Sequence, residues 1–129
     1  MSRKSRILLV DDSELVLAVG RDALEEAGYE VFTASSGIEA NSIIFSRNKP
    51  DLIILDVMMP MLEGHKKARL LKEKEFTKEI PILLLSSKSE DELRRLVGEA
   101  GADGYIRKPF GAGELARVVA DFFRKRGVV

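Results

Sequence analysis

The chain has no cysteine, no long apolar run and no excess of either charge. Without cysteine, neither a disulfide framework nor a thiolate metal site can form, and a cytoplasmic location is allowed. The longest apolar runs, of four or five residues, are too short for a transmembrane helix, and the apolar segment before Asp11 is too short for a signal peptide. We therefore expect a cytoplasmic protein with no membrane contact.

The charge balance argues against nucleic-acid binding, because 21 positive side chains are matched by 21 negative ones. The length of 129 residues suffices for one domain with a sizeable core but not for two. No repeat, low-complexity tract or linker divides the sequence. We expect one domain over residues 1–129, with its core at about 6–124 and no output domain, so that DNA binding would need a separate module.

Short apolar runs alternate with helical patterns along the chain. The runs are Ile7–Val10, Val31–Ala34, Leu52–Leu55, Ile82–Leu85 and, more weakly, Gly104–Ile106. Capping boxes begin at Ser36 and Ser89, while Gly28 and Gly101 stand where helices should end. Five strands that alternate with five helices through short connections predict right-handed crossovers, and hence an α/β fold with a parallel sheet covered by helices on both faces.

Polar side chains follow four of the predicted strands. Asp11 and Asp12 follow the first, Asp56 the third, Ser86 the fourth and Lys108 the fifth. Singly, each has an ordinary structural explanation, such as an acid near a helix N-terminus. Because the carboxyl ends of parallel strands meet at one edge of the sheet, the residues jointly predict a site there.

The residue types at this edge point to phosphoryl transfer. Three crowded carboxylates repel one another unless a cation neutralises them. Oxygen ligands without histidine or cysteine favour Mg²⁺, with Mn²⁺ also possible, and Mg²⁺ in turn suggests a phosphate. Asp56 would attack phosphorus, Lys108 and the metal would neutralise charge on the phosphoryl oxygens, and Ser86 would donate a hydrogen bond to one of them.

Four motifs carry a resemblance to a known family. They are "DD" at Asp11–Asp12, "DVMMPMLEG" at Asp56–Gly64 with its Met59, Pro60 and Gly64, "LSS" with Ser86, and "GYIRKPF" at Gly104–Phe110. With them the chain resembles, from Arg6 to about Arg124, the CheY-like receiver domain of two-component response regulators. The resemblance implies a flavodoxin-like fold whose five-stranded parallel sheet has the order 2-1-3-4-5.

The resemblance also implies how the site works. Asp56 would accept a phosphoryl group from the phosphohistidine of a sensor histidine kinase or phosphotransfer protein. Asp12 would bind Mg²⁺ directly, Asp11 would act largely through water, and Asp56 and the Met58 carbonyl would be further ligands. Such a protein is not a conventional enzyme, although it catalyses its own aspartyl phosphorylation and dephosphorylation. A cis peptide between Lys108 and Pro109 is usual in the family.

A switch is implied as well. On phosphorylation the Ser86 hydroxyl would move toward the phosphoryl group and the Tyr105 ring would turn inward. The face formed by the fourth helix, fifth strand and fifth helix would then change its contacts with an unknown downstream protein. The chain would be a monomer or a phosphorylation-dependent dimer; candidate ion-pairing residues for the dimer are Arg94, Arg95, Glu99, Arg107 and Asp121.

Two methionines and one histidine have structural interpretations. Met59 should pack in the core and the Met58 side chain should be incidental to function. His65, the only histidine, should be an exposed helix residue, neither a phosphohistidine nor a catalytic base.

Two other functions compete with the phosphoacceptor. A metal-dependent phosphatase of the haloacid-dehalogenase type would need a second Asp two residues after the nucleophile, and Met58 stands there after Asp56. The more serious alternative is a phosphorylation-independent receiver-fold interaction module, because a complete site does not prove that a cognate kinase exists.

Overall fold

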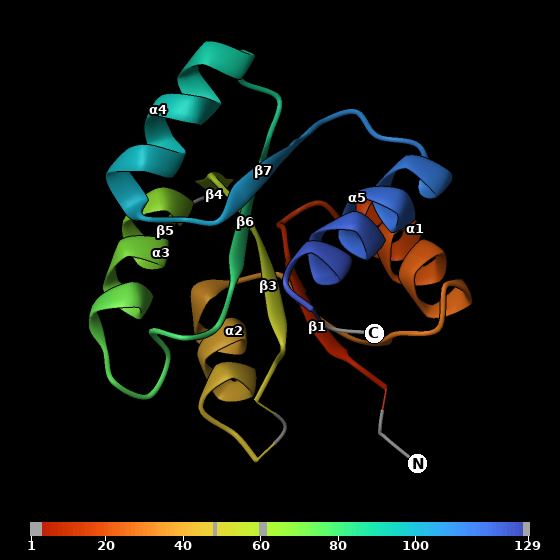
Figure 1. Cartoon of the computed structure of the whole chain (residues 1–129), viewed down its shortest axis with the longest axis horizontal. Helices are drawn as coiled ribbons and strands as arrows, with labels where there is room; N and C mark the ends of the chain where they lie inside the picture. The colour runs from red at the N-terminus through yellow and green to blue at the C-terminus, as the bar shows by residue number, and fades with distance from the viewer. Residues whose placement is uncertain (1–3, 48, 60–61, 128–129) are drawn as a thin grey trace.

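Five parallel strands form the central sheet of the computed structural model, which describes residues 4–47, 49–59 and 62–127 (Figure 1). The strands are β1 (Arg6–Val10), β2 (Glu30–Ala34), β3 (Leu52–Asp56), β6 (Ile82–Ser86) and β7 (Gly104–Arg107). Their order in the sheet is β2-β1-β3-β6-β7, and each neighbouring pair is parallel. Counted along the chain, this is the predicted order 2-1-3-4-5, which is confirmed.

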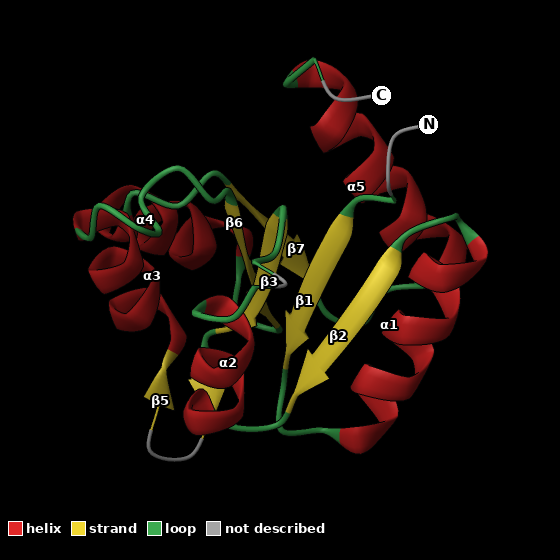
Figure 2. Ribbon diagram, turned by 90° about the horizontal axis from the view of Figure 1, so that it is seen from below, coloured by secondary structure: helices red, strands yellow, loops and turns green. Residues whose placement is uncertain are grey.

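Helices cover both faces of this sheet. They are α1 (Glu14–Glu26), α2 (Gly37–Ile44), α3 (Gly64–Glu73), α4 (Glu90–Ala100) and α5 (Ala112–Lys125). Figure 2 shows α1 and α5 on one side of the sheet and α2, α3 and α4 on the other. In the described parts of the chain, no helix combines the length and apolar character that crossing a membrane requires.

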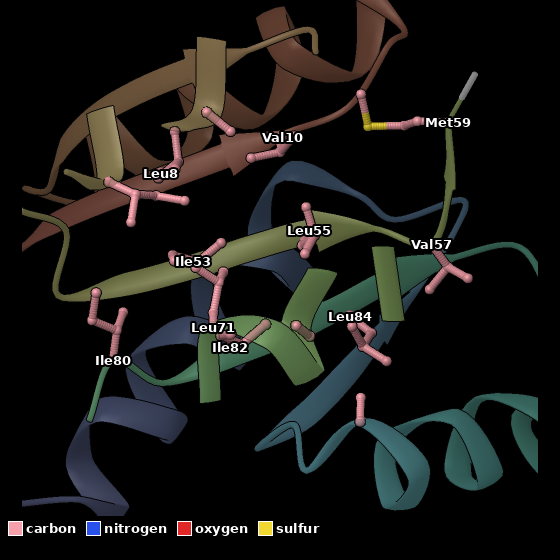
Figure 3. Close-up of a cluster of buried hydrophobic side chains, with 14 of the residues drawn as sticks. Leu8, Val10, Ile53, Leu55, Val57, Met59, Leu71, Ile80, Ile82 and Leu84 are labelled. Carbon is pink, nitrogen blue, oxygen red and sulfur yellow. The ribbon is translucent and has the colours of Figure 1, made fainter. Parts of the chain in front are cut away.

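The sheet separates two apolar cores. On β1, Leu8 and Val10 join the core under α2, α3 and α4, whereas Ile7 and Leu9 join the core under α1 and α5. Figure 3 shows the first of these cores, in which Leu8 and Ile53 extend from neighbouring strands. Every residue of β3 and β6 is buried, as expected for strands covered on both faces.

The predicted helix ends are confirmed, but in the described structure only the serine half of each capping box is seen, since the Glu39 Oε1 accepts from the Ser35 N–H, one residue before the donor of a capping box. The Ser36 Oγ and Ser89 Oγ accept hydrogen bonds from backbone N–H groups three residues later, at 3.2 Å in each case. Gly101, at the end of α4, has the left-handed φ of 69° that favours glycine, and Gly28 also has a positive φ.

A short antiparallel hairpin after β3 was not predicted. It consists of β4 (Met58–Met59) and β5 (Leu62–Glu63) and lies within the motif "DVMMPMLEG", whose Pro60 is outside the described residues. The Met59 side chain is buried, which confirms its predicted packing role, while Met58 is exposed.

Gly64 closes this hairpin against the end of β3. Its N–H donates to the Val57 carbonyl at 3.0 Å. A Cβ at this position would lie 2.1 Å from the carbonyl oxygen of Asp56, far inside van der Waals contact. The motif therefore needs glycine for space beside the backbone of Asp56.

Candidate functional site

The predicted polar residues meet at the carboxyl edge of the sheet. Asp11 and Asp12 follow β1, Asp56 ends β3, Ser86 ends β6 and Lys108 follows β7. The parallel register aligns the end of β3 with β6 and the end of β6 with β7, so these strand ends lie side by side. Residues separated by up to 97 positions in the sequence thus share one crevice.

Three carboxylates form the floor and mouth of this crevice. One oxygen from each of Asp11, Asp12 and Asp56 lies within 4.8 Å of the other two. Asp11 and Asp56 are buried, whereas Asp12 is exposed. The cluster is therefore closed on its inner side and reachable from solvent on its outer side. Its oxygen-only donor set fits a hard divalent cation.

The start of α1 holds the carboxylate of Asp11 in place. The Asp11 Oδ1 accepts a hydrogen bond from the Ser13 N–H at 2.9 Å. The Ser13 Oγ in turn accepts one from the Val16 N–H at 3.3 Å and so caps α1. The turn from β1 into α1 thereby aims Asp11 at the crevice.

Lys108 brings a positive charge between two of the acids. Its Nζ lies 2.6 Å from the Asp11 Oδ2 and 3.4 Å from the Asp56 Oδ2. Burial lowers the pKa of Lys108, but the close pairing with Asp11 and the charge of Asp56 outweigh this effect, so that the pKa is raised overall. Its peptide bond to Pro109 is cis, as the resemblance implied.

Asp56 is the buried nucleophile candidate. Its pKa is raised from 3.8 to about 6, first by burial and further by the negative charge of Asp11. The hydrogen bond from the Met58 N–H to the Asp56 Oδ1, at 3.1 Å, and the charge of Lys108 oppose this rise. A pKa near 6 leaves most of the carboxylate ionised at neutral pH, as a nucleophile requires.

Ser86 places a hydroxyl at the end of the neighbouring strand. The side chain is buried, and its Oγ accepts a hydrogen bond from the Lys88 N–H at 3.0 Å. Because this contact uses the oxygen as acceptor, the hydroxyl hydrogen can still be donated to an oxygen in the crevice.

Tyr105 is held at the start of α4. Its hydroxyl donates to the Glu90 Oε1 at 2.6 Å, which raises the pKa of Tyr105 and lowers that of Glu90. The Arg107 Nε also contacts this region by donating to the Lys88 carbonyl at 3.1 Å. Sequence reasoning missed Glu90, since an acid in the first turn of a helix indicates only a favourable dipole interaction. It named Arg107 only as a candidate for a dimer contact, whereas here Arg107 binds the Lys88 carbonyl of the same chain.

His65 lies in α3 as predicted, but its predicted exposure was wrong, because its side chain is only 24% exposed. It lies in a cleft of about 590 Å³ whose walls include Met59 of the hairpin and Leu96 of α4. Glu63, which ends the unpredicted hairpin, lines the same cleft. The Nε2 lies 3.8 Å from a carboxylate oxygen of Glu63.

The charged residues suggested for a dimer already have intramolecular partners. Arg94, Arg95 and Asp121 pair within their own helices with Glu90, Glu99 and Arg124. In the described structure, these pairs neutralise part of the charge of the α4 and α5 surfaces.

Comparisons with known proteins agree with this geometry. Residues 7–120 match the family described as the response regulator receiver domain. The chain is 42% identical over 121 residues to the phosphate regulon transcriptional regulatory protein PhoB of Pseudomonas aeruginosa, covering 94% of this chain and 52% of that protein. It is 43% identical over 116 residues to the alkaline phosphatase synthesis transcriptional regulatory protein PhoP of Bacillus subtilis, covering 89% and 47%.

The chain thus spans about half the length of these curated relatives. Among solved structures, the chemotaxis response regulator CheY4 of Vibrio cholerae is similar with a TM-score of 0.83 and 32% identity, covering 92% of this chain and 98% of that one. Sequence, fold and the arrangement of acids at the sheet edge agree, and the chain therefore belongs to the response regulator receiver domain family.

Proposed function

We propose that the chain is a phosphoacceptor that takes a phosphoryl group from a histidine kinase or phosphotransfer protein onto Asp56. The observation that carries this proposal is the convergence of Asp11, Asp12 and Asp56, with one oxygen each within 4.8 Å, around the Lys108 ammonium. A nucleophilic carboxylate, further acids for a cation and a fixed positive charge are what phosphoryl transfer to aspartate requires.

The transfer is a displacement at phosphorus. A bond forms between a carboxylate oxygen of Asp56 and phosphorus, while the nitrogen–phosphorus bond of the donor breaks and its electron pair returns to the imidazole. Lys108, 3.4 Å from the Asp56 Oδ2, is placed to neutralise charge on the phosphoryl oxygens, and Ser86 can donate a hydrogen bond to one of them. Asp11, Asp12, Asp56 and the Met58 carbonyl would hold Mg²⁺, which supplies further charge neutralisation when bound.

The phosphoryl group would act as a switch on α4, β7 and α5. Phosphorylation adds an acceptor for the Ser86 hydroxyl, which now contacts the backbone of Lys88. Movement of Ser86 would favour an arrangement in which Tyr105 leaves Glu90 and turns inward, so that the surface of α4, β7 and α5 changes its contacts with a downstream protein. In this function the chain acts in the cytoplasm as a regulator, not as a conventional enzyme.

Intact-mass spectrometry with a small acyl-phosphate donor tests the proposal. We expect the wild type with Mg²⁺ to gain one phosphoryl group, and Asp56→Ala or added chelator to abolish the gain. Asp91→Asn, which changes an exposed acid on α4, is the matched control and should behave as the wild type. No gain at any donor concentration would contradict the proposal and favour a phosphorylation-independent interaction module.

A further inference from the structure

Most of the exposed large apolar side chains belong to two parts of the molecule. Among the described residues, the large apolar side chains with substantial exposure are Leu15, Val19, Ile38, Phe45, Met58, Leu70 and Phe76. Leu15 and Val19 lie on α1, and all the others except Met58 lie on or beside α2 and α3. Apolar groups concentrated in this way on a soluble domain indicate contact with another molecule.

The face on α2 and α3 is built around an aromatic pair. Phe45, at the end of α2, stacks on Phe76, which follows α3, with their ring centroids 5.7 Å apart. Both side chains remain about half exposed, at 46% and 50%. The pair therefore leaves an apolar surface where the two helices end.

Three lysines make this face cationic. The Lys49 Nζ lies 4.5 Å from the Phe76 ring centroid, and the Lys74 Nζ lies 5.6 Å from the Phe45 ring centroid. The Lys67 Nζ donates a hydrogen bond to the side-chain oxygen of Asn41. Within residues 4–47, 49–59 and 62–127, no carboxylate forms an ion pair with any of the three. Burial, and then the charge of Lys74, lower the pKa of Lys67. We call the two phenylalanines and three lysines the basic face.

The exposed side of α1 has the opposite character. Leu15, Val19, Asp22 and Glu26 follow one another at helical spacing and form one exposed stripe. No cation of the described structure forms an ion pair with Asp22 or Glu26. Along this stripe, two aliphatic side chains are followed by two acidic ones, and we call these four residues the acidic face.

The two faces cannot meet within one molecule. Figure 2 shows α1 on one side of the sheet and α2 and α3 on the other. They match between molecules, because the aliphatic groups of one face can cover the aromatic pair of the other while its acids approach the lysines. Nucleic acid fits less well, since base stacking needs free ring faces, and here each ring already carries a second ring and an ammonium group.

We propose that the basic face of one copy binds the acidic face of a second copy, head to tail. Such a contact uses two different surfaces, so it continues from copy to copy instead of closing into a dimer. It does not depend on phosphorylation of Asp56. Because α1 begins two residues after Asp12, the bound copy lies beside the carboxylate crevice.

Sedimentation of the wild type tests whether the contact forms. Up to about 1 mM, where even a millimolar dissociation constant leaves about four in ten of the sites filled, the average mass should rise above 14.4 kDa without levelling off at two chains. The increase in average mass with protein concentration should be smaller at about 1 M salt, because charges on exposed groups are then screened beyond about 3 Å. A mass that stays at one chain throughout would overturn the proposal.

Two blocked variants make the test specific. Lys49→Glu with Lys74→Glu blocks the basic face, and Leu15→Glu with Val19→Glu blocks the acidic face, so each variant alone should associate at least about tenfold more weakly than the wild type. Mixed in equal amounts, they still offer one intact face each and should form a species that stops at two chains. A mixture that stays monomeric would refute the pairing of these two faces.

Controls separate this contact from a general effect of net charge or of misfolding. Arg117→Glu with Arg124→Glu on α5 changes the net charge of the chain as much as the double lysine variant does and should associate as the wild type does. Circular dichroism and thermal melting verify that each variant is folded. A monomeric wild type that binds anionic phosphatidylglycerol vesicles or oligothymidine through Lys49 and Lys74 would replace the second copy with that partner and overturn the proposal.

Discussion

The raised pKa of Asp56 predicts that replacing this residue with asparagine stabilises the protein in the absence of a divalent cation. A carboxylate whose pKa is higher in the folded chain than in the unfolded chain disfavours folding once it must ionise. Asparagine keeps the shape and an oxygen that can accept the Met58 N–H, but it has no charge to bury. The free energy of unfolding of Asp56→Asn should therefore exceed that of the wild type at neutral pH.

The size of this gain follows from the shift from 3.8 to about 6. Each pKa unit corresponds to about 1.4 kcal/mol, so the full shift is worth about 3 kcal/mol. Solvent at the mouth of the crevice screens part of it, and we expect about 1–3 kcal/mol, or roughly 4 °C in melting temperature for each kcal/mol in a domain of this size.

The sign of the pH dependence distinguishes a buried charge from a change in packing. Below pH 3.8 the carboxyl is protonated in both states, and the charge-related difference between wild type and variant should vanish. As pH rises from 3.8 to about 6, the unfolded chain releases the proton that the folded chain still holds, so the wild type loses stability relative to the variant. Above about pH 6 the difference is complete.

Urea unfolding in chelator at several pH values between 4 and 8 measures this difference. Asp91→Asn is the control, since its exposed carboxyl should give no comparable gain. Added Mg²⁺ should reduce the difference in free energy of unfolding between Asp56→Asn and the wild type, because a cation that binds only the folded wild type stabilises it. The reasoning would be refuted if Asp56→Asn had a lower free energy of unfolding than the wild type at pH 7. It would also be refuted if the variant exceeded the wild type by the same amount at pH 4 as at pH 7.

Three further predictions concern single side chains. Gly64→Ala should lower the free energy of unfolding in urea by at least about 3 kcal/mol, because its Cβ would collide with the Asp56 backbone. Gly98→Ala, whose Cβ would meet nothing within 4 Å, should raise that free energy by up to about 1 kcal/mol, and equal effects of the two variants would contradict the steric explanation. Tyr105→Phe should raise the pKa of Glu90 toward its ordinary value in a carbon-detected NMR titration, since the Tyr105 hydroxyl is the main cause of its lowering; an unchanged value would exclude that hydrogen bond in solution. Lys108→Ala should raise the pKa of Asp56 above about 6 and shift the pH dependence of its phosphorylation upward, and a lower pKa would show that the Lys108 charge does not act on Asp56.

The sheet and the carboxylate crevice were predictable because strong local patterns agree with one another. Apolar runs such as "LIIL" and "ILLL" read as strands buried on both faces, and the structure buries every residue of β3 and β6. Once the sheet is parallel, the positions of Asp11 and Asp56 at one edge follow from topology alone. The amino-acid pattern therefore determines both the fold and which side chains meet.

The features that the sequence did not predict depend on contacts between elements. The β4–β5 hairpin has only two residues in each strand, too few for a periodic signal. Its residues Met59 and Glu63 line the cleft in which the partly exposed His65 lies. The bond between Tyr105 and Glu90 joins residues 15 positions apart on different elements. Nothing in the local pattern around either residue specifies such a partner.

The order of strands in the sheet also bears on how the protein is made. β1 leaves the ribosome first, yet one of its two neighbours is β3, and the strand that leads to Lys108 is the last of the five to emerge. A nascent chain that ends before about residue 100 carries all three carboxylates but not the lysine that lies between two of them. Synthesis past β7 thus adds the positive charge of Lys108 to a set of three acids that otherwise repel one another.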